Sequence, residues 1–476
     1  MSEIAGEIDE RPAGHGRQAR TVALVVAVAF FMQLLDGTII ATSLPQMGES
    51  FGVRPVDMSI GITAYMLTMA AFIPLSGWLG DRFGARRIFL LSIVIFTIAS
   101  LFCGLSQNLW QFVVARALQG TGGALMIPVG SLIVLKNAKK SELVGAIALI
   151  TWPALTAPVL GPLLGGFITT YASWHWNFFI NLPIGALGIA LVLRFIPETR
   201  DTTSRRLDIV GFLLSAGGLT AVLASLETLV HGTLGILEFA SLALGALLLA
   251  AAAWHFGRVK EPLLDLSTFR VQTFAASSAT GGLACRTAIS ATPFLLPLLF
   301  QVGFGVSAIV AGGYVLVYFL GNLTMKTVTT PLLRLIGFRP ILVGNGVLNA
   351  ASIAACGFLT PTTPQALIYG LLFLSGMFRS MQFTAMNSLG FADIGPTQRS
   401  SATTLSSMLQ QISMLLGVAI AAASLNLSAQ FRGLGHVELA DFRIAFGLAG
   451  LIALVAALSY MQLPKNVASE VSGHKA

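Results

Sequence analysis

Five ionisable side chains lie within apolar stretches that are long enough to form membrane-spanning helices: Asp36, Arg116, Arg286, Lys326 and Arg379. A charge at membrane depth costs about 3 kcal/mol or more, so such a residue usually faces a wet cavity and belongs to a path for a substrate or for protons. One carboxylate and four cations in such positions predict a transporter whose pathway is predominantly basic.

The composition is that of an integral membrane protein. Of 476 residues, 55% are hydrophobic and 10% are charged, whereas a soluble domain carries about 25% charged residues. The three cysteines all lie in apolar segments, which argues against a disulfide framework. The six histidines form no pair at metal-ligand spacing, and no basic patch is interleaved with exposed aromatic residues. We therefore expect no metal, no cofactor and no nucleic-acid partner.

The apolar stretches divide into fourteen predicted transmembrane helices, since a span needs about 20 apolar residues. This predicts an all-α membrane fold of two pseudo-symmetric six-helix bundles around a central cavity, with a two-helix insert between them. The predicted helices lie near residues 22–44, 58–80, 87–107, 109–135, 141–170, 174–196, 208–229, 235–256, 273–301, 307–333, 338–360, 364–390, 401–425 and 440–462. The predicted divisions are a tail (1–21), the first bundle (22–200), the insert (201–272), the second bundle (273–463) and a second tail (464–476).

The distribution of Lys and Arg predicts the orientation. With the N-terminus in the cytoplasm, 21 of the 28 basic residues fall on the cytoplasmic side, three fall in outer loops and four lie inside spans. This bias follows the positive-inside rule. We therefore expect a multi-pass protein of the plasma (inner) membrane with both termini in the cytoplasm, surrounded by lipid and acting as a monomer.

The loop after the second predicted helix carries a spaced motif of glycines and charges. A loop that merely obeys the positive-inside rule would explain its arginines, but not the Gly-x-x-x-Asp-Arg-x-Gly spacing. A weak internal repeat pairs Gly84 with Gly337 and Arg86 with Arg339, whereas Asp81 falls opposite Arg334. We expect the glycine that opens the motif to permit close helix approach and the aspartate to be gripped by the other bundle. The motif residues are Gly77, Asp81, Arg82, Gly84, Arg86 and Arg87.

Together with three further stretches, this loop resembles the major facilitator superfamily and, within it, the 14-helix drug:proton antiporter family, in a bacterial multidrug or citrate exporter branch. Residues 35–45 are similar to that family's first-helix signature, 116–123 to its fourth-helix motif, and 173–183 to its opening of helix six. The fifth-helix motif associated with antiporters is similar to Pro158, Gly161, Pro162, Gly165 and Gly166. The resemblance covers the first 200 residues densely and the last 200 mainly in helix count. Ala41 and Ala157 depart from it.

The resemblance implies a proton-coupled efflux antiporter, in which Asp36 binds the proton and Arg116 moves with it. Burial favours the neutral form of a carboxyl group, so Asp36 could load and release a proton as Arg116 approaches or withdraws. A packing or capping role for Asp36 beside Gly37 is the alternative. The prolines and glycines of the fifth helix are expected to form a hinge, and ordinary helix packing is the alternative there.

The second bundle contributes cations but no deeply placed acid. Because arginine pairs with carboxylates in a bidentate fork, a small organic anion would suit this half, whereas the family resemblance favours multidrug export. Lys326 could instead extend toward the membrane surface. The predicted substrate-cavity residues are Arg286, Lys326, Arg379, Gln33, Gln119 and Asn387.

Among function classes, a secondary transporter exporting small molecules by alternating access is the leading prediction. Gly120 to Gly123 lacks the Lys and Ser/Thr of a phosphate-binding loop, so an ion gradient, with protons as the coupling ion, must supply the energy. No Ser-His-Asp set clusters along the chain, and we expect no enzymatic activity. A membrane receptor or sensor, or a non-coupled facilitator with the same fold, is the alternative.

Overall fold

The computed structural model describes residues 15–137, 143–198, 207–230, 236–259, 262–395, 398–433, 436–464 and 467–468. Every regular element in these residues is helical. In the first half they are α1 (His15–Ile39), η1 (Ile40–Thr42), α2 (Leu44–Phe51), η2 (Pro55–Met58), α3 (Ser59–Phe83), α4 (Ala85–Leu105), α5 (Leu109–Asn137), α6 (Leu143–Tyr171), α7 (Trp176–Phe179) and α8 (Asn181–Phe195). Two helices follow, α9 (Ile209–Val230) and α10 (Ile236–Phe256). The second half comprises η3 (Leu266–Arg270), α11 (Gln272–Ser278), α12 (Gly281–Leu298), η4 (Leu299–Gly303), α13 (Ala308–Ile336), α14 (Phe338–Cys356), α15 (Gln365–Ala392), α16 (Arg399–Phe431), α17 (Leu439–Ser459) and η5 (Tyr460–Gln462).

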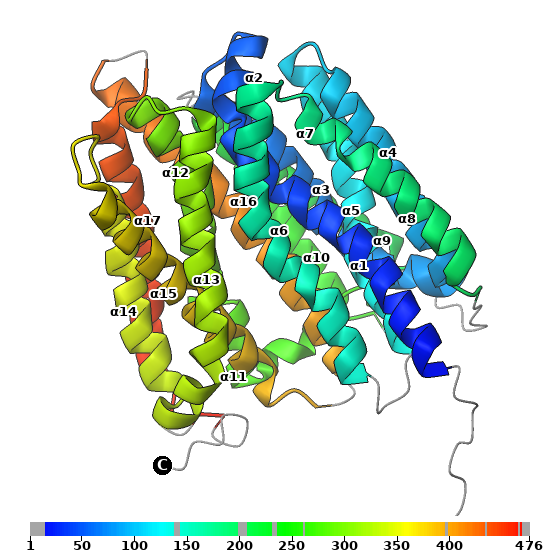
Figure 1. The fold of residues 1–476 in the computed structure, drawn as a ribbon. Helices are drawn as coiled ribbons and strands as arrows, with labels where there is room; N and C mark the ends of the chain where they lie inside the picture. Colours follow the sequence, from blue (N-terminus) through cyan, green and yellow to red (C-terminus); the bar gives the residue numbers. More distant parts are fainter. Residues whose placement is uncertain are drawn as a thin grey trace, which may run out of the picture.

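The long helices run roughly side by side, as a membrane protein requires (Figure 1). By length and composition, eleven stretches of the described residues could cross a membrane. Three further helices, α6, α9 and α14, contain 29, 22 and 19 residues. The all-helical membrane fold is thus confirmed, and these helices together are consistent with the fourteen predicted. The sequence did not predict that the sixth helix is broken into α7 and α8 or the ninth into α11 and α12.

The internal repeat is visible in the backbone. Gly84 and Gly337 each separate two consecutive long helices, and their φ angles are +91° and +85°. A residue with a Cβ rarely adopts this conformation, so glycine is required at both turns. The pairing of these two glycines that the sequence predicted is therefore matched by the same local geometry.

The arginines two residues further on also make equivalent contacts. Arg86 Nη2 donates to the carbonyl of Leu193 at 2.6 Å, near the end of α8. Arg339 Nη2 donates to the carbonyl of Met461 at 2.8 Å, just after α17. Each arginine thus satisfies a carbonyl at a helix C-terminus, where a positive charge also suits the helix dipole.

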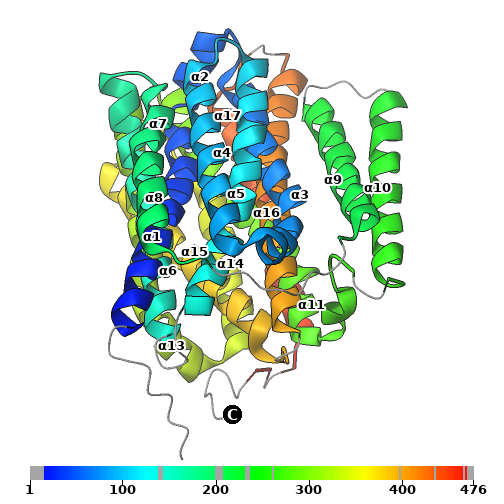
Figure 2. The same ribbon diagram turned by 90° about the vertical axis from the view of Figure 1, so that its right-hand side faces the viewer.

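The insert is a hairpin of α9 and α10 that lies on the flank of the molecule (Figure 2). Helix α9 packs against α3 of the first half and α16 of the second. The rings of Phe72 and Phe212 meet at 5.6 Å between α3 and α9. The insert therefore covers a seam between the two halves and stays away from the centre.

A buried carboxylate fastens one end of this hairpin. Asp208 accepts hydrogen bonds from the Gly211 amide (2.8 Å) and the Leu263 amide (3.2 Å), and its Oδ1 lies 2.7 Å from His255 Nε2. Burial acts to raise the pKa of Asp208, but these hydrogen bonds and the nearby His255 outweigh it and hold the pKa below its usual value. Asp208 thus ties both insert helices to the connection that follows them.

The two halves meet tightly at one end through small residues. A Cβ on Gly166 would lie 2.5 Å from the carbonyl oxygen of Ala308, and one on Gly312 would clash with the carbonyl of Pro162. Helices α6 and α13 therefore touch backbone to backbone here, as small residues allow in membrane bundles. Toward the opposite end the two helices diverge (Figure 1).

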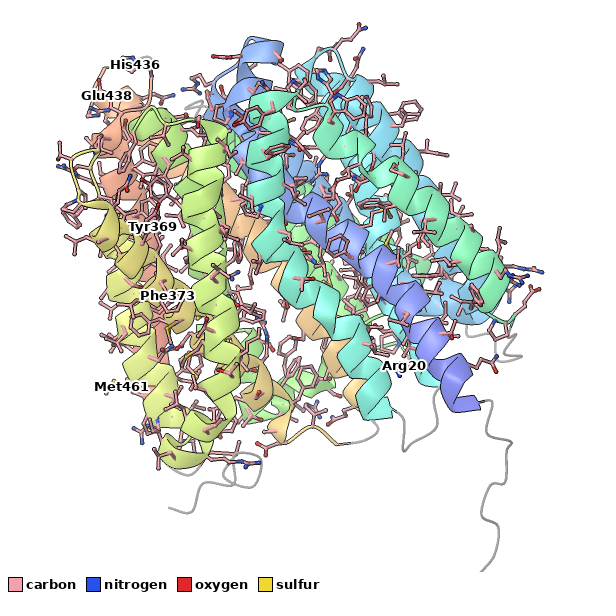
Figure 3. All side chains as sticks on the ribbon, viewed as in Figure 1. Arg20, Tyr369, Phe373, His436, Glu438 and Met461 are labelled. Atoms are coloured by element: carbon pink, nitrogen blue, oxygen red, sulfur yellow. The ribbon has the colours of Figure 1, made fainter. Side chains whose placement is uncertain are left out.

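Two hydrogen bonds reinforce the contact between the halves. Gln301 Nε2 donates to the carbonyl of Thr42 at 3.0 Å, and the Ile309 amide donates to Thr170 Oγ1 at 3.2 Å. This closed end is the one that carries the α16–α17 loop with His436 and Glu438, whereas Arg20 and Met461 lie toward the other end (Figure 3).

Replacing Gly312 by Ile should force α6 and α13 apart at the closed end, because the added side chain has no room beside Pro162. Gly313 is the matched control, since nothing lies within 4 Å of a Cβ built there. Spin labels on Tyr171→Cys and Val310→Cys should report a longer distance in Gly312→Ile and an unchanged one in Gly313→Ile. Equal distances in both variants would refute backbone-limited closure.

Candidate functional site

The centre of the first bundle holds a buried ion pair. Arg116 Nη1 of α5 lies 2.7 Å from Asp36 Oδ2 of α1, and each residue is 1% exposed. The two residues are 80 positions apart in sequence. The structure thus brings together the acid and the arginine that the sequence proposed as partners.

Two amide side chains complete the surroundings of the carboxylate. Gln119 Nε2 and Asn181 Nδ2 each donate to Asp36 Oδ1 at 2.8 Å. The same two nitrogens donate to Ser100 Oγ, at 2.7 Å and 3.2 Å. Asp36 therefore accepts three hydrogen bonds, which is the arrangement of an ionised carboxylate that can only accept.

Arg116 is held on its other sides as well. Its Nη1 donates to Gln119 Oε1 at 2.5 Å. Its guanidinium carbon lies 4.2 Å from the ring centroid of Tyr65 and 5.9 Å from that of Phe178. A cation over an aromatic face within about 6 Å is attracted by the ring, so the apolar wall of the site stabilises the charge.

Glycines of α5 explain why this site can form. A Cβ on Gly120 would clash with the Tyr65 carbonyl on α3, and one on Gly122 would lie 2.8 Å from the Phe96 amide on α4. A Cβ on Gly123 would lie 3.1 Å from the Tyr65 hydroxyl. The glycines of the fourth-helix motif therefore let α5 approach two neighbours closely and carry Arg116 and Gln119 to Asp36.

The predicted cavity residues of the first bundle are buried beside this network. Gln119 was grouped with the substrate residues, but it is 0% exposed and bonds Asp36. Gln33 donates to Met69 Sδ at 3.8 Å, and its buried Oε1 has no hydrogen-bond partner. Both glutamines thus belong structurally to the surroundings of the ion pair.

The fifth-helix motif lies against α1. A Cβ on Gly161 would clash with Thr38, and one on Gly165 with the carbonyl of Ile39. Thr38 Oγ1 donates to the carbonyl of Ala157 at 3.3 Å. The motif therefore links the helix of Asp36 to the contact between α6 and α13. The side chain of Pro158 lies outside the described residues.

The motif after α3 makes fewer contacts than the sequence suggested. Nothing lies within 4 Å of a Cβ built on Gly77, so the close approach expected there does not occur in this structure, in which α6 and α13 diverge toward this end (Figure 1). Arg82 is exposed, and Arg87 forms a 2.5 Å salt bridge with Glu198. The side chain of Asp81 lies outside the described residues.

The three cations of the second bundle do not form one cluster. Arg286 is 2% exposed and donates through Nη2 to Asn387 Oδ1 at 2.6 Å, while its Nε and Nη1 have no hydrogen-bond partner. Arg379 is half-buried, and its guanidinium carbon lies 5.7 Å and 5.6 Å from the rings of Tyr318 and Phe319.

Lys326 is exposed on α13, where its charge and that of Arg379 repel each other. The polar group opposite Arg286 is thus Asn387, which the sequence placed beside Arg379. The reason is that α12 packs against α15, so the two residues meet across a helix pair.

Sequence reasoning missed three members of the ion-pair site. Asn181 lies in the helix-six stretch that resembled the family, but nothing in its spacing points to Asp36. Ser100 and Tyr65 stand in apolar helices without any distinctive pattern. Only the packing of α3, α4 and α8 around α1 and α5 brings these side chains to the pair.

Comparison with known proteins identifies the family of this transmembrane chain. The profile described as Major Facilitator Superfamily matches residues 26–418 and 280–476. The chain belongs to the major facilitator superfamily. It is therefore a multi-pass membrane protein with the fold of secondary transporters, and no feature of it favours a receptor or sensor.

Curated relatives and solved structures agree with this assignment. Proteins of Escherichia fergusonii and Escherichia coli named "Putative multidrug resistance protein MdtD" are 40% identical over 407 residues, which is 85% of this chain and 85% of each relative. The fold is similar to that of a D-xylose-proton symporter (TM-score 0.67, 14% identity, 94% of this chain and 98% of that one). It is also similar to that of the nucleoside transporter NupG (TM-score 0.64, 14% identity, 92% and 99%).

Arg116→Leu should destabilise the protein by about 3–5 kcal/mol, since it leaves the Asp36 charge buried and unpaired. Asp36→Asn combined with Arg116→Leu should cost less than the sum of the single changes. Thermal unfolding of the purified protein in detergent would measure both effects.

The exposed pair of Arg54 and Asp57 (2.8 Å) is the matched control for the buried pair. Arg54→Leu should cost about 1 kcal/mol or less, because solvent screens such a pair. Strict additivity of Asp36→Asn and Arg116→Leu would contradict a direct ion pair.

Proposed function

We propose that this major facilitator protein is a proton-coupled antiporter that exports small molecules by alternating access. The observation that carries the proposal is the buried pair of Asp36 and Arg116. A carboxylate at membrane depth is costly and is usually retained for function. A facilitator that merely lets its substrate equilibrate has no need of such a group, so the pair supports coupling.

In this proposal Asp36 carries the proton. In the present geometry three donors surround its carboxylate, which suits the deprotonated state. Protonation would remove the negative charge and with it the attraction to Arg116. The loss of this attraction could release α1 from α5 and bias the bundles toward the alternative state. A membrane potential contributes about 2.3 kcal/mol per charge per 100 mV, enough to drive such a cycle.

We further propose that the protein lies in the inner membrane as a monomer, with lipid around it and both termini in the cytoplasm. The basic residues of the sequence favour this orientation. The closed end, at which α6 and α13 touch, would then face the outside and the opposite end the cytoplasm. A substrate collected from the cytoplasm for export requires such a state.

Asp36→Asn fixes the site in a neutral form, so it should abolish substrate flux driven by an imposed pH gradient while leaving substrate exchange. Proteoliposomes that contain the purified variant provide the measurement. Asp57→Asn, which removes an acid at the protein surface beside Arg54, should leave proton-driven flux unchanged. Intact pH dependence in Asp36→Asn would place the proton site elsewhere.

The substrate class is the second part of the proposal. The name of the MdtD relatives supports drug export. The cations of the second bundle instead favour an organic anion, because Arg379 is half-buried beside aromatic rings, Lys326 repels it, and two donor nitrogens of Arg286 have no partner. We propose an anionic or zwitterionic substrate that binds through Arg379 and Arg286, with Lys326 as a supporting charge.

Arg379→Ala should lower the affinity for an anionic substrate by about 2 kcal/mol or more, the cost of losing a buried charge partner. A thermal-shift screen of organic anions and lipophilic cations, followed by calorimetric titration, would supply ligands and affinities. Arg258→Ala is the control, since its guanidinium is 4.1 Å from the Trp254 ring in the insert, away from the proposed path. Tight binding of lipophilic cations that neither Arg379→Ala nor Arg286→Ala changes would refute the anionic assignment.

A further inference from the structure

A serine determines which way the amide groups around Asp36 point. The Ser100 hydroxyl donates its hydrogen to the carbonyl of Phe96 at 2.8 Å. A hydroxyl has one hydrogen to donate, so Ser100 Oγ can only accept from its other neighbours. Those neighbours are Gln119 Nε2 at 2.7 Å and Asn181 Nδ2 at 3.2 Å. Both amides must therefore turn their nitrogens toward Ser100 and Asp36.

The opposite ends of the two amides are consistent with this orientation. Gln119 Oε1 accepts from Arg116 Nη1 at 2.5 Å and from Cys103 Sγ at 3.7 Å. Asn181 Oδ1 is buried without any partner. Leaving an amide oxygen unpaired in the interior is costly, and turning the amide would point its oxygen at the carboxylate instead. The charge of Asp36 is therefore what the Asn181 nitrogen serves.

We propose that Asn181 and Ser100 are positioning residues that make the site accept only ionised Asp36. Every group that contacts its carboxylate oxygens is a donor, so the hydrogen of a protonated carboxyl would find no acceptor there. Binding a proton would then break the contacts of Asp36 with Asn181 and Gln119, as well as weaken the pair with Arg116. The inference rests on the proposed function of Asp36 as the proton-binding residue.

Helix α8 thereby becomes part of the coupling machinery. Asn181 is the first residue of α8, and its amide joins α1 and α4 to that helix. The charged and titratable groups that face Asp36 are Arg116 of α5, Tyr65 of α3 and Cys103 of α4. The sequences of α6, α7 and α8 hold no acid, and their only titratable side chains, Tyr171 and Arg194, lie at the far ends of α6 and α8. The hydrogen bonds of the amides are thus the main influence on the proton affinity beside the ion pair.

The test is a pH titration of the full chain in liposomes by infrared spectroscopy, which needs no substrate. The C=O stretching band of a protonated carboxyl that disappears in Asp36→Asn reports the proton on Asp36. Asn181→Leu removes a donor to the ionised form, and a hydrogen bond to a charged group is strong enough to move the titration midpoint by about one pH unit or more. The midpoint should therefore rise in Asn181→Leu.

Ser100→Ala provides a second variant that removes only a hydroxyl group and is unlikely to prevent folding. It frees both amides to turn, so the midpoint should rise in the same direction. Asn177→Leu is the matched control: Asn177 lies four residues before Asn181, is equally buried, and donates to Ser43 and Thr169 instead of Asp36. Its midpoint should equal that of the unmodified protein.

Two results separate the inference from the function on which it rests. A midpoint that stays unchanged in both Asn181→Leu and Ser100→Ala, while the Asp36 band still titrates, would overturn the role of the amide network alone. A set of bands from which Asp36→Asn removes nothing would instead overturn Asp36 as the proton-binding residue.

Discussion

The burial of Asp36 and Arg116 in the middle of a membrane bundle is the constraint around which the first half is organised. Neither charge could stay there alone, because an unpaired ion inside apolar surroundings costs several kcal/mol. The pair is therefore surrounded by amides, a hydroxyl and an aromatic ring that together satisfy the carboxylate and cover the guanidinium. These groups come from α1, α3, α4, α5 and α8, so the pair also fixes how five helices are arranged.

Small residues make that arrangement possible. Helices in a membrane gain little from apolar burial and associate through close packing. The glycines of α5 bring Arg116 to Asp36, and those of α6 connect α1 to the second bundle through the Gly166 contact with Ala308. A change at Asp36 that moves α1 would therefore act on the same helix pair that closes one end of the molecule.

The two halves share a backbone plan but differ in chemistry. Gly84 and Gly337 have matching conformations, and Arg86 and Arg339 make matching contacts. The buried arginine of the first half has a carboxylate partner, whereas the hydrogen-bond partner of Arg286 in the second half is the neutral amide of Asn387. This difference supports a division of labour in which the first half handles protons and the second handles the substrate.

The sequence by itself determined the membrane class, the helical fold and the pairing of Asp36 with Arg116, because apolar length and misplaced charge are local properties that a single chain displays. The repeat of Gly84 and Gly337 was readable for the same reason, since a positive φ restricts the residue type. Only the tertiary structure decided that Gln119 belongs to the ion pair, that Asn387 faces Arg286, and that Asn181, Ser100 and Tyr65 complete the site. These contacts join residues from separate helices, and no spacing along one helix records which neighbour its polar face will meet.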